Sequence, residues 1–229
     1  KKNYEETVNS LGSGETSVAL LGPLTYLEAR AKYGAVSILK SRGVDGTTSY
    51  RSVIITKKDS PVRTLAELKG KSVAFASSKS TSGNLIPRYL LAGAGIHLNE
   101  LGSYTNFDYH DSVVKAVLKC QYTAGAVRDS VARKYIKLGI AVIAESASIP
   151  TGPLVASPGT PTAVIEDIKK ALLDLDPGKA DGQRVLKRLD EDFKNGFTEA
   201  TDKDYADIRS KINAIPQTCG IGCHPKMKL

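Results

Sequence analysis

The sequence feature that most constrains the fold is a run of small hydroxyl residues between a predicted strand and a predicted helix. The run is Ser77–Gly83, which reads Ser-Ser-Lys-Ser-Thr-Ser-Gly. Before it, Lys71–Ala76 is apolar and β-branched, as in a buried strand, and after it Leu85–Ala92 has helical periodicity. A strand that turns directly into a helix is typical of α/β folds.

The same turn predicts a binding site for an anion. The first N–H groups of a helix have no partner inside the helix, and they lie at the positive end of its dipole. Several hydroxyl groups beside them would complete a cradle for a phosphate-like oxyanion. The structural alternative is a serine N-cap. A single serine is enough for a cap, so the run of hydroxyls favours anion binding.

Composition favours an anionic partner and argues against nucleic-acid binding and a membrane span. The chain has 229 residues, enough for one large domain or two lobes, and its net charge is +8 with a pI near 9.3. Its lysines and arginines are spread along the chain and it has no tryptophan, so we do not expect nucleic-acid binding. No apolar run approaches the roughly 18 residues that a membrane span needs.

Elsewhere, predicted strands and helices alternate along the chain. The predicted strands are Ser17–Leu21, Val36–Lys40, Tyr50–Thr56, Thr123–Val127, Ile140–Ala144 and Leu154–Ala156. The predicted helices are Tyr4–Leu11, Leu24–Tyr33, Asp111–Cys120, Val131–Leu138 and, after Pro161, the remainder of the chain. This alternation predicts an α/β protein with mainly parallel sheets flanked by helices.

Seven motifs, in order, resemble those of a known family. They are Val18–Tyr26, Tyr50–Pro61, Leu65–Lys71, Ser80–Gly83 with Pro87, His110–Leu118, Ala124–Val127 and Ile149–Pro153. Together they resemble the phosphonate/phosphite/phosphate-type periplasmic solute-binding proteins of ABC importers. The resemblance extends to about Arg209.

The resemblance implies a type II periplasmic binding fold, in which two α/β lobes are joined by a hinge. Lobe one would comprise residues 1–56 plus 154–215, lobe two with the hinge segments 57–153, and a C-terminal tail 216–229. Family members begin with a further strand–helix–strand, so the resemblance implies that this sequence starts after that segment.

The resemblance also places specific residues on the ligand. Ser80, Thr81 and Ser82 would bind the oxyanion, with Tyr50 at the edge of lobe one and His110 opposite. Short, neutral O–H and N–H donors suit a desolvated dianion. A lone histidine after a strand is more often structural, but its place in the motif favours a binding role for His110.

The position of acidic residues bears on the ligand class. In relatives that bind aminoalkyl phosphonates, the resemblance places acids against the ammonium group at positions matching Gly152 and, approximately, Ser130; Asp129 is adjacent to the second. The absence of a clear acid favours phosphate, phosphite or a simple alkylphosphonate.

The C-terminal tail departs from the family pattern. Cys219, Cys223 and His224 form a Cys-x-x-x-Cys-His sequence, one residue longer than the c-type haem signature. It could attach haem c through two thioethers, with His224 as one axial ligand and His97 as the other. A Cys219–Cys223 disulfide or free thiols are the alternatives; a zinc site would be short of ligands.

The third cysteine, Cys120, is predicted to be a free structural thiol at the end of a helix, away from the expected cleft. Capture of a ligand by this thiol is the alternative. The odd number of cysteines is compatible with either role.

We therefore expect a periplasmic or exported solute-binding protein that captures a small phosphorus oxyanion, with an ABC permease as the partner that the resemblance implies. We do not expect an enzyme, because no nucleophile–base pair or carboxylate-rich metal site is evident. The alternatives are the ligand-sensing domain of a signalling protein and a haem-carrying redox or sensor protein on the same scaffold.

Overall fold

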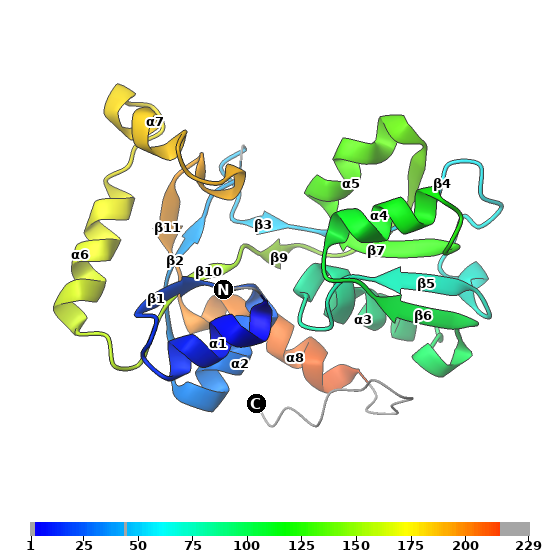
Figure 1. The fold of residues 1–229 in the computed structure, drawn as a ribbon, viewed down its shortest axis with the longest axis horizontal. Coiled ribbons are helices and arrows are strands. Elements are labelled where there is room, and N and C mark those ends of the chain that lie inside the picture. The colour runs from blue at the N-terminus through cyan, green and yellow to red at the C-terminus, as the bar shows by residue number, and fades with distance from the viewer. Residues whose placement is uncertain (1–2, 44, 216–229) are drawn as a thin grey trace. The chain divides into compact units, whose positions relative to one another are not determined.

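A computed structural model describes residues 3–43 and 45–215 of the chain. The chain divides into two compact units (Figure 1). Of the described residues, unit 1 comprises 3–43, 45–49 and 150–209, and unit 2 comprises 50–149 and 210–215. Within the described residues, the chain thus crosses between the units at 49/50, at 149/150 and at 209/210. The short strands β3 (Ser49–Tyr50) and β9 (Ile149–Pro150) pair at the first two crossings.

Unit 1 contains a four-stranded sheet in the order β1-β10-β2-β11. Its strands are β1 (Val18–Leu20), β2 (Val36–Ser41), β10 (Pro153–Ala156) and β11 (Phe197–Glu199), and every pairing among them is antiparallel. Its helices are α1 (Tyr4–Gly12), α2 (Pro23–Tyr33), α6 (Thr162–Leu173), α7 (Ala180–Leu186), η5 (Glu191–Phe193) and η6 (Asp202–Tyr205), and α8 (Ala206–Ala214) begins here.

Buried polar contacts hold the returning segment of unit 1 in place. The Tyr205 hydroxyl donates to the Thr151 carbonyl at 3.0 Å, and Thr151 Oγ1 donates to the Ser41 carbonyl at 2.8 Å. The ring of Tyr205 also packs edge-on against Tyr26, with centroids 4.9 Å apart. Thr151, just after the second crossing, is therefore bonded directly to β2 and linked to α2 through Tyr205.

Unit 2 contains a five-stranded sheet in the order β6-β5-β7-β4-β8. Its strands are β4 (Ser52–Lys57), β5 (Ser72–Phe75), β6 (Ser103–Asn106), β7 (Ala124–Arg128) and β8 (Ile140–Glu145). Its helices are η1 (Ala66–Leu68), η2 (Thr81–Leu85), α3 (Ile86–Gly93), η3 (Leu98–Glu100), α4 (His110–Leu118), α5 (Asp129–Tyr135) and η4 (Ile136–Leu138).

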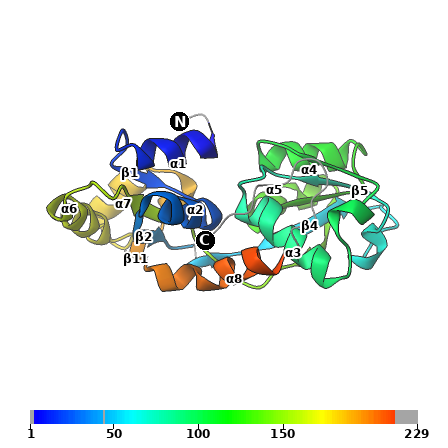
Figure 2. The same ribbon diagram turned by 90° about the horizontal axis from the view of Figure 1, so that it is seen from below.

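Strand β4 organises the core of unit 2 because its side chains alternate between the two faces of the sheet. Val53 and Ile55 pack with the buried valines of α4 on one face, whereas Ile54 packs with Leu91 of α3 on the other. Figure 2 shows α4 and α3 on opposite faces of this sheet. The unit is thus a three-layer α/β structure.

The structure corrects two parts of the predicted architecture. Neither sheet is mainly parallel. The sheet of unit 1 is antiparallel, and that of unit 2 is mixed, because β5 runs parallel to β6 and β7 whereas β4 runs antiparallel to β7 and β8. Apolar runs locate strands but carry no information on strand direction. The expectation that the chain is helical after Pro161 was wrong at β11, which is too short to show a clear period.

The boundaries of the units differ from those expected for the lobes. Residues 52–56 were assigned to lobe one, but they belong to β4, which pairs with two strands in the sheet of unit 2. Residues 150–153 were assigned to lobe two with its hinge segments, but they belong to unit 1, where Thr151 is buried. Across residues 3–43 and 45–215, no helix combines the length and the apolar character needed to cross a membrane.

The hydroxyl group of Thr56 gives a test of the packing around β4. Thr56 is fully buried, and its Oγ1 has no hydrogen-bond partner among the described residues. A buried hydroxyl without a partner costs about 1–3 kcal/mol. Thr56→Val keeps the shape and removes this cost, so we expect a higher midpoint of thermal unfolding. A midpoint several degrees lower would contradict the packing described for β4.

Candidate functional site

The hydroxyl-rich turn forms a capped and widened helix start in unit 2. Ser80 is the N-cap, and its Oγ accepts a hydrogen bond from the Gly83 amide at 3.0 Å. The Leu85 amide donates to the Ser80 carbonyl at 3.1 Å, five residues back, which makes Thr81–Leu85 a π-helical turn before α3 begins. Such turns occur mostly as single widened turns of α-helices and are frequent at functional sites.

Gly83 lets this turn approach the end of β5. A Cβ atom at this position would lie 2.3 Å from the Cβ of Ala76 and 2.8 Å from Cε1 of His110. The Gly83 carbonyl accepts from the Ala76 amide at 2.8 Å. Only a residue without a side chain therefore allows the turn, the strand end and the histidine to meet.

His110 is the first residue of α4, and the structure determines which of its ring nitrogens carries the proton. Nδ1 accepts a hydrogen bond from the backbone amide of Arg128 at 3.1 Å, so Nδ1 is unprotonated. In the neutral ring the hydrogen must then be on Nε2, which lies 3.2 Å from Ser80 Oγ. Burial, followed by the nearby Arg128 cation, lowers the pKa of His110 from 6.5 to about 4, which keeps the ring neutral at pH 7.

These contacts determine the role of the Ser80 hydroxyl. Its oxygen accepts one hydrogen bond from Gly83 and one from His110, which occupies both of its lone pairs. Its own hydrogen is then the donor that the group still offers. Ser80, Thr81 and Ser82 are all buried, so a group that binds here meets donors with little competition from water.

Arg128 is the residue of this site that the sequence reasoning missed. Its guanidinium carbon lies 4.5 Å from the centre of the Tyr50 ring, a cation–π contact, while its backbone amide holds His110. A basic residue directly after the small-residue strand Ala124–Val127 was the available signal. Through Arg128 the structure brings Tyr50, His110 and Ser80 into one set of contacts. Tyr50 belongs to unit 2, although it was expected at the edge of lobe one.

Other residues singled out in the sequence lie elsewhere or outside the described part of the chain. His97 precedes η3, and its backbone amide donates to the Glu100 carboxylate at 3.0 Å, a capping contact. Cys120 is free and exposed, in a left-handed conformation just after α4 with φ of 57°. Cys219, Cys223 and His224, proposed for haem c or a disulfide, lie outside the described residues. Among residues 3–43 and 45–215, no cluster of three His, Cys, Asp or Glu side chains could hold a metal ion.

Replacing Gly83 tests the close approach at the turn, and Gly93, at the end of the following helix, is the matched control. Gly83→Ala places a methyl carbon 2.3 Å from the Cβ of Ala76 and 2.8 Å from Cε1 of His110, closer than carbon atoms can approach. We therefore expect a clearly lower midpoint of thermal unfolding. Gly93, at the end of α3, has open space around it, and Gly93→Ala should be neutral or slightly stabilising. Equal midpoints for the two variants would contradict the close approach at Gly83.

The pKa of His110 predicts how stability depends on pH. Between pH 6.5 and about pH 4 the unfolded chain binds a proton at this ring and the folded chain does not, so stability should fall as the pH is lowered through this range. The loss is at most about 3 kcal/mol. Comparison with His110→Gln isolates it, since that variant lacks the titrating ring. An NMR titration that placed the pKa of His110 near 6.5 would show that the ring is not held as described.

Comparison with known sequences identifies relatives over most of the chain. The sequence model of the periplasmic phosphonate-binding proteins of ABC transporters matches residues 1–205. A probable phosphite-binding protein of an ABC transporter, PhnD1 of Prochlorococcus marinus, is 27% identical over 143 residues, which are 59% of this chain and 48% of that protein. The phosphonates-binding periplasmic protein of Escherichia coli is 31% identical over 91 residues, 38% of this chain and 27% of that protein. The matches thus span half or less of these curated relatives.

Solved structures show the same fold. PhnD1 of Prochlorococcus marinus in complex with methylphosphonate has a TM-score of 0.78 and 21% identity, covering 92% of this chain and 82% of that one. A binding-protein component of an ABC phosphonate transporter from Pseudomonas aeruginosa also has a TM-score of 0.78, with 20% identity and coverage of 92% and 72%. These matches confirm the two-lobed type II periplasmic binding fold. With the match over residues 1–205, they show that the chain belongs to the family of phosphonate-type periplasmic substrate-binding proteins of ABC transporters.

Proposed function

We propose that this chain is the periplasmic solute-binding component of an ABC importer and captures a small phosphorus oxyanion at the Ser80–Gly83 turn, which we call the anion cradle. The observation that carries the proposal is the hydrogen bonding of the Ser80 hydroxyl. Because its oxygen already accepts two hydrogen bonds, its hydrogen is directed to a further acceptor. An oxyanion is an acceptor of this kind.

The electrostatics of the cradle suit an anion. The dipole of the helix start and the Arg128 guanidinium place positive potential beside neutral O–H and N–H donors. His110 contributes no charge at neutral pH, so it acts on Ser80 as a fixed donor. Hydrogen bonds from buried neutral groups to a charged acceptor are about twice as strong as those between neutral partners.

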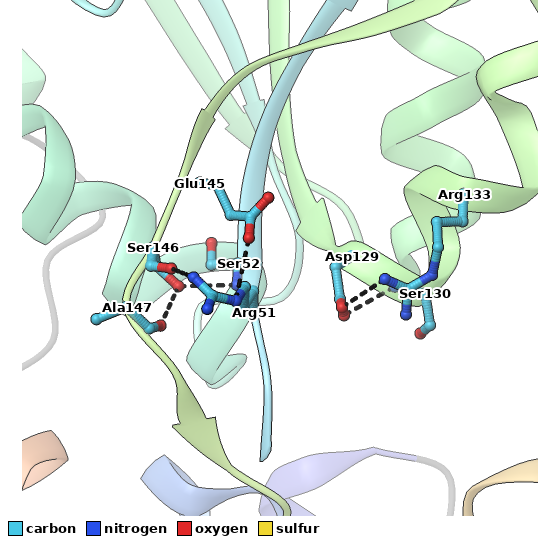
Figure 3. A network of polar contacts seen from close by, with 8 residues as sticks. All are labelled: Arg51, Ser52, Asp129, Ser130, Arg133, Glu145, Ser146 and Ala147. Atoms are coloured by element: carbon cyan, nitrogen blue, oxygen red, sulfur yellow. Dashed lines mark hydrogen bonds and ion pairs between the residues drawn. The ribbon is translucent and has the colours of Figure 1, made fainter. Parts of the chain in front are cut away.

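Two features favour a ligand without an amino group. Gly152 has no room for an acidic side chain, because a Cβ there would lie 2.3 Å from the Leu21 carbonyl oxygen. Asp129 is already paired with Arg133 at 2.9 Å and accepts from the Ser130 amide at 2.8 Å (Figure 3). Neither position supplies a carboxylate for an ammonium group. Phosphate, phosphite and methylphosphonate are therefore the ligand class that we propose.

The family is a solute-binding component of transporters and not an enzyme family. We propose the same role for the present chain. Its partner is a permease, and it closes around its ligand by a hinge motion. Family membership favours this function over the signalling-sensor and haem-protein alternatives. The haem c prediction rests on residues outside the described part of the chain and stays a prediction.

Removal of the Ser80 hydroxyl tests the proposed function. Ser80→Ala deletes a buried donor to a charged group and the cap of the Gly83 amide, so the affinity for methylphosphonate should fall by about ten- to a hundredfold. Thr81→Ala in addition should weaken binding further. Ser103→Ala, an exposed serine on β6, is the control and should bind like the unchanged protein. Isothermal titration calorimetry with phosphate, phosphite, methylphosphonate and 2-aminoethylphosphonate gives the affinities.

Equal affinity of Ser80→Ala and Ser103→Ala would exclude the cradle as the binding site. Tightest binding of 2-aminoethylphosphonate would contradict the ligand class.

A further inference from the structure

A buried serine outside the cradle holds the cradle backbone. Ser52, the first residue of β4, is fully buried, and its Oγ donates to the Ser82 carbonyl at 2.7 Å. This contact joins two segments that are 30 residues apart in the sequence. It also fixes the orientation of the peptide between Ser82 and Gly83.

The position of Ser52 is itself fixed by a second buried serine. The Ser52 amide donates to Ser146 Oγ at 3.0 Å, and Ser146 Oγ donates to the Ala147 carbonyl at 2.7 Å. The Ser146 amide donates to the Ser52 carbonyl at 2.9 Å. Figure 3 shows these residues side by side, where β4 begins and where the chain leaves β8.

An ion pair on the neighbouring residue reinforces this arrangement. Arg51 Nε lies 3.0 Å from a carboxylate oxygen of Glu145, and its Nη1 donates to the Ser146 carbonyl at 2.9 Å (Figure 3). The pair is half exposed, so it contributes little by itself. Its effect is to keep the segments 51–52 and 145–147 together. These are the segments that lead from unit 2 into the crossings at 49/50 and 149/150.

The π-helical turn explains why the cradle needs an external support. In a regular helix each carbonyl is held by the amide four residues later. In Thr81–Leu85 the hydrogen bonds span five residues, and the Ser82 carbonyl receives its donor from the side chain of another strand. The orientation of the peptide between Ser82 and Gly83, and of the Gly83 amide that holds Ser80 Oγ, therefore depends on Ser52.

We propose that Ser52 is a positioning residue for anion binding and that, with Ser146, it connects the cradle to the segments that cross between the units at 49/50 and at 149/150. This inference rests on the proposed function for its ligand. Since coupling between two sites is reciprocal, an anion in the cradle would also stabilise the arrangement of the crossing segments.

The test compares Ser52→Ala with Thr56→Val. Both residues are fully buried hydroxyl side chains on β4, but the Thr56 hydroxyl has no partner among the described residues. Methylphosphonate affinity is measured by calorimetry, and hydrogen exchange of the Gly83 and Leu85 amides is measured by NMR in the ligand-free protein. A purely structural role for Ser52 would lower the thermal midpoint without changing the affinity of the folded protein.

We expect Ser52→Ala to bind methylphosphonate about tenfold more weakly and to exchange the Gly83 amide about tenfold faster. Thr56→Val should change neither quantity. Ser52→Thr, which keeps the hydroxyl, should restore both, and Ser146→Ala should reproduce the loss in weaker form. Unchanged affinity and unchanged exchange in a folded Ser52→Ala protein would overturn the inference.

Failure of the proposed function has a different signature. If the unchanged protein binds none of the phosphorus oxyanions, the proposed function is wrong. The exchange of the Gly83 amide in Ser52→Ala then still decides whether Ser52 positions the turn, because that measurement needs no ligand.

Discussion

The hydrogen bond from the Arg128 amide to Nδ1 of His110 is the contact on which the rest of the site depends. It places the ring proton on Nε2, and this proton then occupies the second lone pair of Ser80 Oγ. In a flipped ring or in the other tautomer, no ring N–H would point at Ser80. The Ser80 hydroxyl could then direct its hydrogen toward the ring instead of toward a ligand. One backbone amide at the end of β7 thus sets the direction of a side-chain donor on another segment.

This arrangement requires three segments to meet within van der Waals distance. Ala76 after β5, the π-helical turn η2 and His110 at the start of α4 come together at Gly83, where no side chain would fit. Such a close approach also excludes water from the ring, which is why the pKa of His110 falls to about 4. Packing and electrostatics are therefore linked, because the contact that removes solvent also keeps the donor neutral. The cation nearby, Arg128, is held over the face of Tyr50.

Local sequence rules predicted the elements of this site but not the bonds between them. The strand–turn–helix at Lys71–Ala92 and the N-cap role of a serine follow from hydroxyl residues and periodicity, and motif order indicated His110 and the family. The direction of β4 and the strand β11 were not predictable, because an apolar run carries no direction and three residues carry no period. Ser52, Ser146 and Arg128 were missed for a related reason. Their roles arise from contacts between segments that are distant in the sequence. Ser52, for example, contacts residues 30 and 94 positions away, and no local pattern records such contacts.

A crystal structure of the protein with methylphosphonate would test the central claim most directly. The account predicts a phosphonate oxygen within about 3 Å of Ser80 Oγ, with the Arg128 amide still bonded to Nδ1 of His110. A phosphonate bound away from the Ser80–Gly83 turn, or one that accepts its hydrogen bonds while Ser80 Oγ donates elsewhere, would contradict it.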